Sequence, residues 1–255
     1  MKLTQRNYFS KKASMEYMSV SQFKAFQKCP ASALAEIKGK YKREETTALL
    51  VGSYVDAYFE GTLANFIKKN PAIFKKDGTL KADYVQAEAI IQRILKDRLF
   101  TEYLSGLKQV IMTGEINGVK VKIKVDSLHP DKIVDLKIMG DFADKYDSEK
   151  GFLPWFEYWQ YELQGAVYQE IVRQNTGEQL PFYLAAATKE KITDIDIVQI
   201  EQPMLDFALD RFKRDVELYD AIKQGVIEPP RCEKCEYCKI SKALKQPRSS
   251  DEFYI

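Results

Sequence analysis

The sequence predicts an α/β protein in which helices flank a mixed β-sheet. Through the first hundred residues, apolar side chains recur at the spacing of amphipathic helices. From residue 119 to 126 the pattern changes to strict alternation of apolar and polar residues, as in a half-buried strand. Further strand-like and helix-like segments then follow in turn. This order favours a layered α/β architecture over a helical bundle.

The front of the chain is expected to be helical. Ser19 or Ser21 can cap a first helix that runs toward Cys29, because a serine hydroxyl accepts a hydrogen bond from the unpaired N–H groups of a first turn. A second helix begins near Thr46. A third covers about 81–100, where isoleucines recur at helical spacing.

Two neighbouring strands are expected in the middle of the chain. Residues 119–126 read Val-Lys-Val-Lys-Ile-Lys-Val-Asp, which gives this strand one apolar and one charged face. The next strand covers 133–138, after a turn at Pro130-Asp131. The remaining pattern predicts a helix over 155–175, strands over 181–188 and 194–201, and a helix over 204–223.

Length and charge set limits on the class of protein. The 255 residues are expected to form a single domain, with a helical part at 18–100, a sheet core at 108–201, and a C-terminal helix with a cysteine-bearing tail at 203–255. The 39 Lys and Arg nearly balance the 37 Asp and Glu, which excludes a wholly basic DNA-coating protein but not a local basic groove. Because no stretch is apolar enough for a membrane span or a secretory signal, a cytoplasmic protein without a membrane partner is expected.

The chain contains one histidine, His129, and this limits its chemistry. Histidine-rich zinc sites, two-histidine iron sites and HExxH proteases all need more imidazoles than one. A Ser-His-Asp triad would have to use His129, which lies in the turn-like sequence His-Pro-Asp. The chemistry is therefore expected to depend on carboxylates, lysines or thiolates.

The two central strands predict a pair of neighbouring carboxylates. A turn centred on Pro130-Asp131 pairs residues whose numbers sum to 261, so Asp126 faces Asp135 across the strands with Cβ atoms about 4.5–5.5 Å apart. Lys137 lies on the same face as Asp135 because side chains alternate along a strand. The opposite face is expected to be lined by Val121, Ile123, Val125, Val134, Leu136 and Ile138.

Two close carboxylates repel each other unless a positive charge neutralises them. A hard divalent cation, Mg²⁺ or Mn²⁺, is suited to this role because it prefers oxygen ligands and keeps several waters. A metal-bound water beside Lys137 can then become a nucleophile. The alternative is a surface hairpin with a solvated charged face that includes Lys122 and Lys124.

These residues resemble a known catalytic pattern. Asp126-x8-Asp135-Leu136-Lys137 is similar to the D…(D/E)xK signature of the PD-(D/E)XK nuclease superfamily. Three further segments resemble RecE-type (exodeoxyribonuclease VIII-like) nucleases and their RecB-like and CRISPR-associated relatives. They are Met18-Ser-Val-Ser-Gln-Phe through Cys29-Pro30, Gly52-x3-Asp56, and Gln164-x3-Tyr168.

The resemblance implies a restriction-endonuclease-like fold and a set of roles. Asp126, Asp135 and the Leu136 carbonyl would bind Mg²⁺ or Mn²⁺, together with Asp56, which stands where many relatives have a histidine. Lys137 would act on the attacking water. Gln164 and Tyr168, one helical turn apart, would contact DNA.

The four cysteines suggest a second metal site. Cys232, Cys235 and Cys238 form a CxxCxxC run, and such spacing in a cytosolic protein favours a metal over disulfides. Some of the relatives hold an iron–sulfur cluster with one N-terminal and three C-terminal cysteines, and Cys29 would be the N-terminal one. The run here is shorter than the CxxCx5C of those relatives. A [4Fe–4S] cluster, Zn²⁺, and reduced metal-free cysteines that include a redox role therefore all remain open.

The function implied by the resemblance is a Mg²⁺-dependent deoxyribonuclease. It would be an exonuclease that degrades linear double-stranded DNA from its ends, 5′→3′, in phage-type homologous recombination. A single-strand annealing recombinase would be its partner, and a homo-oligomer its assembly. One alternative is an endonuclease or CRISPR-type integration nuclease on the same fold. The alternative from another class is a non-catalytic DNA-binding or cysteine–metal scaffold protein.

Overall fold

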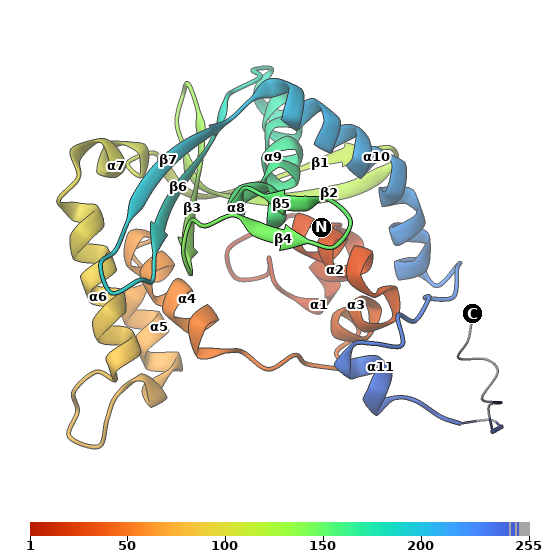
Figure 1. Cartoon of the computed structure of the whole chain (residues 1–255). Coiled ribbons are helices and arrows are strands. Elements are labelled where there is room, and N and C mark those ends of the chain that lie inside the picture. The colour runs from red at the N-terminus through yellow and green to blue at the C-terminus, as the bar shows by residue number, and fades with distance from the viewer. Residues whose placement is uncertain (245, 248, 250–255) are drawn as a thin grey trace.

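A computed structural model describes residues 1–244, 246, 247 and 249, and this part of the chain contains a five-stranded sheet in the order β1-β2-β3-β6-β7 (Figure 1). Neighbouring strands are antiparallel except for β3 and β6, which are parallel. The mixed α/β architecture predicted from the sequence is confirmed. The strands are β1 (Leu107–Ile116), β2 (Val119–Leu128), β3 (Ile133–Met139), β6 (Phe182–Thr188) and β7 (Ile195–Ile200).

Helices pack against both faces of the sheet (Figure 1). One face is covered by α9 (Tyr161–Thr176), behind which lie α10 (Gln202–Gln224), α2 (Val20–Lys28) and α3 (Pro30–Ile37). The other face is covered by α4 (Thr47–Phe59) and α6 (Ala82–Leu95). The smaller elements are α1 (Lys11–Glu16), α5 (Leu63–Lys69), the 3-10 helix η1 (Pro71–Ile73), α7 (Arg98–Tyr103), β4 (Lys145–Asp147), β5 (Gly151–Leu153), α8 (Trp155–Tyr158) and α11 (Glu236–Ile240).

Caps explain where the helices begin. Ser19 starts α2 with a capping box shared with Gln22, and Thr46 caps α4 through the Leu49 N–H. The helix expected over 81–100 is interrupted, because the Asp97 side chain caps a new helix, α7. The helix expected over 155–175 is likewise two helices, because Gln160 between them is left-handed with φ 53°.

The strand β1 has no counterpart in the sequence-based prediction. It forms a hairpin with β2 through Asn117 and Gly118, whose φ angles are 49° and 74°. Positive φ at both central residues is the geometry of the tight hairpin turn that Asn-Gly favours. This dipeptide, between two apolar runs, is the sequence signal that predicts β1.

The register of β2 and β3 is the one predicted, but the faces are not. Ser127 pairs with Val134, and Leu128 with Ile133, so the numbers sum to 261. The apolar residues of β2 and β3 were predicted to line one face, but they lie on opposite faces of the sheet. Val121, Ile123 and Val125 pack on the α9 side, whereas Val134, Leu136 and Ile138 pack on the α4 side.

An irregularity at Asp126 explains this correction. Val125 and Leu128 belong to the same core cluster although they are three residues apart, so the alternation of side chains breaks between them. On the neighbouring strand, Gln109 has a left-handed φ of 54° and interrupts the β1–β2 register opposite Asp126. The β1–β2 register is the same before and after this point, and only the Gln109–Asp126 pair is missing from the ladder. The two faces of β2 change sides here.

Beyond these two residue pairs β3 diverges from β2, and the N-terminal segment takes its place. Met18 forms a parallel bridge with Val121, in which its N–H donates to the Lys120 carbonyl at 2.8 Å and its carbonyl accepts from the Lys122 N–H at 2.9 Å. The stretch 123–126 of β2 therefore lies between the part of the strand that pairs with Met18 and the part that pairs with β3. It borders the cavity described below. Among the described residues, no helix is both long and apolar enough to cross a membrane.

Candidate active site

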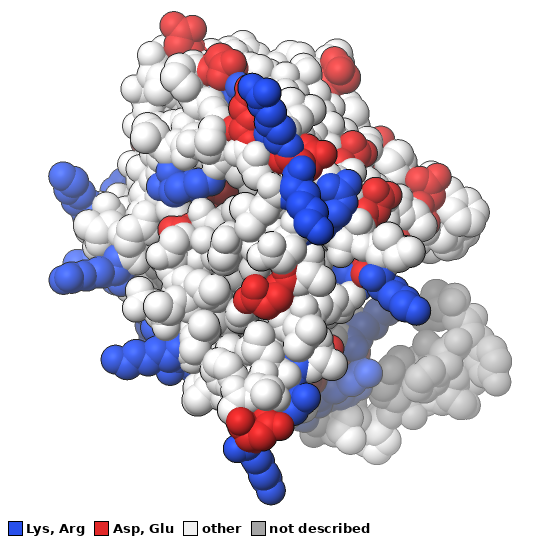
Figure 2. Space-filling model, turned by 90° about the vertical axis from the view of Figure 1, so that its left-hand side faces the viewer, with Lys and Arg blue, Asp and Glu red and all other residues white. Residues whose placement is uncertain are grey.

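A cavity of about 840 Å³ opens where β2 and β3 diverge. Its walls come from the N-terminal segment, α2, α4, α5, α9 and the two strands. Outside it, the face of the molecule in Figure 2 carries basic and acidic side chains dispersed among one another, without a continuous basic surface. All the candidate nuclease residues lie in the lining of the cavity: Asp56, Asp126, Asp135, Leu136, Lys137, Gln164 and Tyr168.

Asp126 is fixed between two strands by hydrogen bonds to both of its carboxylate oxygens. Its Oδ2 accepts from the backbone N–H of Leu136 on β3 at 3.1 Å. Its Oδ1 accepts from Nε2 of Gln109 on β1 at 3.0 Å. Gln109 is buried, and its left-handed backbone breaks the ladder opposite Asp126, where its side chain reaches the carboxylate. The sequence-based prediction did not include Gln109, because strand periodicity gives no sign of a left-handed residue.

Asp135 is almost fully buried and is held from two sides. Its Oδ1 accepts a hydrogen bond of 2.6 Å from Nε2 of Gln164 on α9. Its Oδ2 forms an ion pair with the Lys137 ammonium, which also lies 4.9 Å from the centroid of the Tyr161 ring. The structure therefore brings the predicted carboxylate, lysine and glutamine into direct contact.

The charges at the site are shifted by burial and by one another. Burial raises the pKa of Asp135 to about 7, with the nearby Asp126 charge adding to the rise and Lys137 opposing it. Burial alone would lower the pKa of Lys137, but the Asp135 carboxylate outweighs it, so the pKa lies above the ordinary value. Burial, followed by repulsion from Asp126, raises the pKa of Asp56 well above its usual value. The carboxylates of the site thus repel one another, and the Lys137 ammonium offsets this repulsion only in part.

These donors fit a hard divalent cation. Carboxylate oxygens are the ligands that Mg²⁺ and Mn²⁺ prefer, and a bound cation would relieve the repulsion that raises the pKa values of Asp56 and Asp135. In this part of the chain the oxygens of Asp56, Asp126 and Asp135 are not all within 4.8 Å of one another, whereas the four cysteine sulfurs described below are. Asp126 and Asp135 act on each other directly and form the core of the candidate site, and Asp56 lies at its α4 side.

The helix α9 presents Gln164 and Tyr168 to the site from the face opposite α4. Tyr168 donates from its hydroxyl to the Lys124 carbonyl of β2 at 3.2 Å. Its burial raises the pKa of the phenol well above the usual value, so the hydroxyl keeps its proton. In the metal-free protein both side chains hold elements of the site in place: Gln164 holds Asp135, and Tyr168 holds the exposed edge of β2.

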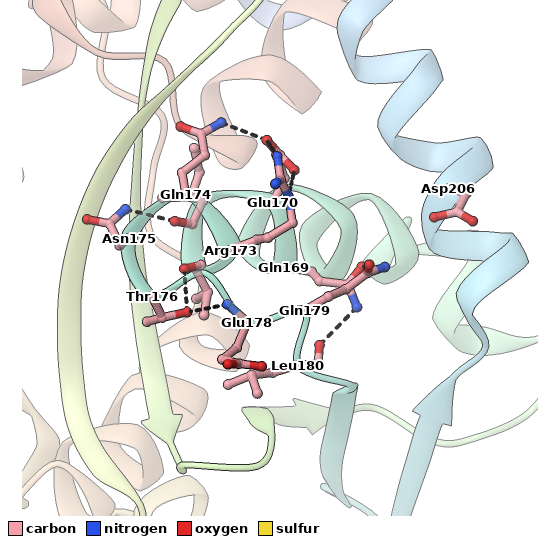
Figure 3. A network of polar contacts seen from close by, with 12 residues as sticks. Gln169, Glu170, Arg173, Gln174, Asn175, Thr176, Glu178, Gln179, Leu180 and Asp206 are labelled. Carbon is pink, nitrogen blue, oxygen red and sulfur yellow. Dashed lines mark hydrogen bonds and ion pairs between the residues drawn. The ribbon is translucent and has the colours of Figure 1, made fainter.

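A polar network fixes the far end of α9 (Figure 3). Gln169 donates to the Leu180 carbonyl at 2.9 Å and exchanges hydrogen bonds with Gln202 of α10. Gln174 donates to the Glu115 carbonyl of β1 at 2.8 Å. Because α9 is tied to three neighbouring segments, the position of Gln164 one and a half turns earlier is set by the whole fold rather than by its own helix.

Lys24 is a site residue that the sequence-based prediction did not single out. It lines the cavity from α2, donates to the Trp159 carbonyl at 2.9 Å, and lies 5.1 Å from the centroid of the Tyr161 ring. Burial, followed by repulsion from Lys137, lowers its pKa to about 7. Its position within the Ser-x-Ser-x-Φ segment that begins at Ser19 is the signal that could have pointed to it.

The four cysteines come together away from this cavity. Cys29, between α2 and α3, lies beside the run Cys232, Cys235 and Cys238, and all four Sγ atoms are within 4.8 Å of one another. Sγ of Cys29 is 3.6 Å from Sγ of Cys238, and backbone N–H groups donate to two of the other sulfurs. Four converging sulfurs fit a tetrahedral zinc or a [4Fe–4S] cluster.

Comparisons with known proteins agree with this geometry. The family model of a "PDDEXK-like domain of unknown function (DUF3799)" matches residues 19–241. A crystal structure from Eubacterium rectale, named "Putative exonuclease", superposes with a TM-score of 0.95 at 48% sequence identity, over 99% of this chain and 98% of that one. No curated protein matches. With the family model covering most of the chain and both D…DxK carboxylates, the protein belongs to this PDDEXK-like family and has its restriction-endonuclease-like fold.

Proposed function

We propose that the protein is a metal-dependent DNA exonuclease. The observation that carries this proposal is the meeting of Asp126, Asp135 and Lys137 in one cavity, at the point where β2 and β3 diverge. The fold and family support a nuclease, and the printed name of the similar crystal structure supports the exonuclease class. A non-catalytic scaffold has no need of a buried carboxylate with a raised pKa beside a lysine.

Asp126, Asp135 and the Leu136 carbonyl, with Asp56 from α4, are the residues that would hold Mg²⁺ or Mn²⁺. When bound, the cation supplies charge stabilisation for the phosphate and lowers the pKa of a coordinated water. Gln109 and the Leu136 N–H orient Asp126, so that its carboxylate needs no reorganisation.

Lys137 is charged in the metal-free protein, because its pKa is raised by Asp135. Its ammonium can donate a hydrogen bond to the attacking water or to a phosphate oxygen, and so position that group beside the carboxylates. Gln164 keeps Asp135 in place, and Lys24 adds a second amine on the α2 wall, which can donate a hydrogen bond to a phosphate oxygen. Together these residues orient a phosphodiester for hydrolysis.

The proposed substrate is the end of linear double-stranded DNA, degraded 5′→3′ in phage-type homologous recombination. The resemblance to RecE-type nucleases supports this polarity, a single-strand annealing recombinase as partner, and a homo-oligomer. A near-neutral chain whose basic residues are dispersed over the face in Figure 2 would gain from such an assembly, because a closed oligomer holds DNA without a strongly basic surface.

End-labelled duplexes test the function directly. Linear DNA labelled at the 5′ or the 3′ end is incubated with the wild type, Lys137→Ala or the control Lys76→Ala, in Mg²⁺, Mn²⁺ or EDTA. We expect cleavage from one end in either metal, none in EDTA, and a loss of at least about 100-fold in Lys137→Ala with DNA binding retained. Lys76 is exposed and lies outside the cavity, so its variant should cleave normally. Cleavage of closed circular DNA would identify an endonuclease instead, and normal activity of Lys137→Ala would refute catalysis at this site.

We propose in addition that the cysteine quartet holds a [4Fe–4S] cluster, with Zn²⁺ as the alternative. The convergence of Cys29 with Cys232, Cys235 and Cys238 supports a bound metal over free thiols. The site lies between α3 and α11, so its role would be structural, tying the C-terminal part of the chain to the N-terminal helices.

A further inference from the structure

The N-terminal segment before α2 forms one wall of the active-site cavity. Gln5, Tyr8 and Phe9 line it together with the catalytic carboxylates. The segment is held at both ends: Gln5 donates to the Gln109 carbonyl at 2.6 Å, and Ser10 caps α1 through the Ala13 N–H. Its residues therefore occupy fixed positions relative to the site.

Tyr8 anchors the segment on the charged side of β2. The Lys122 ammonium donates to the Tyr8 carbonyl at 2.6 Å and lies 4.6 Å from the centroid of its ring. Lys122 is 3% exposed, so this side of the strand is covered by the segment and is not the solvated face of a surface hairpin. Burial, followed by the charge of Asp126, raises the pKa of the Tyr8 phenol, and both residues line the same cavity.

Phe9 follows Tyr8 and is directed differently. Its ring is 76% exposed, although it lines the cavity. It stands edge to face against Tyr8, with ring centroids 4.9 Å apart, and the Lys124 ammonium lies 5.1 Å from its centroid. Single exposed apolar residues are ordinary on protein surfaces. Here, however, the exposed ring packs on Tyr8 and lies beside a lysine in the wall of the cavity.

A ring and an amine side by side are what a single DNA strand requires. A base has an apolar face that stacks on an aromatic ring, and its phosphate pairs with a neighbouring ammonium. The cavity, at about 840 Å³, has the size of pockets that enclose small ligands, which suits a few nucleotides and not a double helix. A single strand that enters the cavity can bring a phosphate to Asp126 and Asp135, which lie in its lining.

We propose that Phe9 is the stacking platform for an unpaired base of the strand being cut, and that Lys124 binds the adjacent phosphate. This inference rests on the proposed nuclease function and names how its substrate is held: as a single strand separated from the duplex end. Phe9 acts in binding and not in bond cleavage. Its loss is therefore expected to raise KM and leave kcat nearly unchanged.

The test measures stacking without turnover. A short single strand with a terminal 2-aminopurine is titrated in EDTA with Lys137→Ala, and with the same protein that also carries Phe9→Ala, Phe9→Leu, Phe9→Tyr or the control Phe207→Ala. Phe207 is 69% exposed on α10 and does not line the cavity. Stacking quenches 2-aminopurine. We expect quenching with the parent, Phe9→Tyr and Phe207→Ala, and loss of quenching with about tenfold weaker binding for Phe9→Ala and Phe9→Leu.

Three outcomes would overturn the proposal: unchanged quenching in Phe9→Ala, equal behaviour of Phe9→Leu and Phe9→Tyr, or no binding of single strands by the parent. Because the ring is exposed, the Phe9 variants should keep the melting temperature of the parent. A thermal melt of each variant would reveal any loss of binding that comes from unfolding. Binding and cleavage are read separately here. Quenching by the Lys137→Ala parent, with no nuclease activity of the wild type, would refute the proposed function alone. Cleavage by the wild type, with no quenching by the parent, would refute the stacking alone.

Discussion

Gly165 is the position at which the smallest substitution should have a calculable effect. It lies on α9, directly after Gln164, where the helix packs on β6 and α10. A Cβ atom there would lie 2.5 Å from Cδ1 of Phe182 and 2.9 Å from Cδ2 of Leu205. Both neighbours are almost completely buried, at 0% and 1% exposure, so neither ring nor methyl group has free space to move into.

Two opposing effects set the magnitude for Gly165→Ala. Alanine favours the helix over glycine by about 1 kcal/mol. Overpacking of a well-filled core costs about 1–3 kcal/mol, and three contacts below 3.0 Å with two buried neighbours place this site in the upper part of that range. The net loss of unfolding free energy is therefore about 1–2 kcal/mol. For a chain of this size, that corresponds to a fall in Tm of roughly 3–6 °C.

Thermal unfolding followed by circular dichroism measures this difference. Gly140→Ala is the matched control, because a Cβ at Gly140 meets no heavy atom within 4 Å and its φ is not left-handed. We expect the control to stay within about 1 °C of the wild type. If Gly165→Ala melts at or above the wild-type temperature, α9 can shift without cost. Packing at Gly165 then does not fix the position of Gln164.

Two further predictions concern the two candidate metal sites. In metal-free buffer, the unfolding free energy of the wild type should fall as the pH rises from about 4 to about 7. The reason is that folded Asp135, with a pKa of about 7, keeps a proton that the unfolded chain has released. Asp135→Asn should weaken this dependence in pH-resolved melting curves, with the part due to Asp56 remaining, and an unchanged slope would contradict the assignment. Anaerobically purified wild type should contain iron or zinc by elemental analysis, and Cys238→Ser should lose most of it together with stability; a metal-free wild type would exclude the site.

Local patterns in the sequence determined the parts of the site that lie within one element. Alternation placed Asp135 and Lys137 on one face of β3, and the turn at Pro130 set the register with β2. Helix caps at Ser19 and Thr46 were also local, because a cap depends on residues within one turn. The resemblance of spaced motifs then indicated the PD-(D/E)XK superfamily, which the family model confirms, whereas the RecE-type branch stays a prediction.

Tertiary structure alone decided which faces and which distant segments meet. Periodicity assumes an unbroken strand, so it could not foresee that Gln109 and Asp126 interrupt the ladder and reverse the faces of β2. Nor could it place Tyr8 on Lys122, because such a contact depends on how the whole chain packs. The meeting of Cys29 with the cysteine run was indicated by the family resemblance and not by periodicity. The sequence by itself thus determined which candidate residues lie on each element, because their spacing is local, whereas the packing of the fold decided what surrounds and positions them.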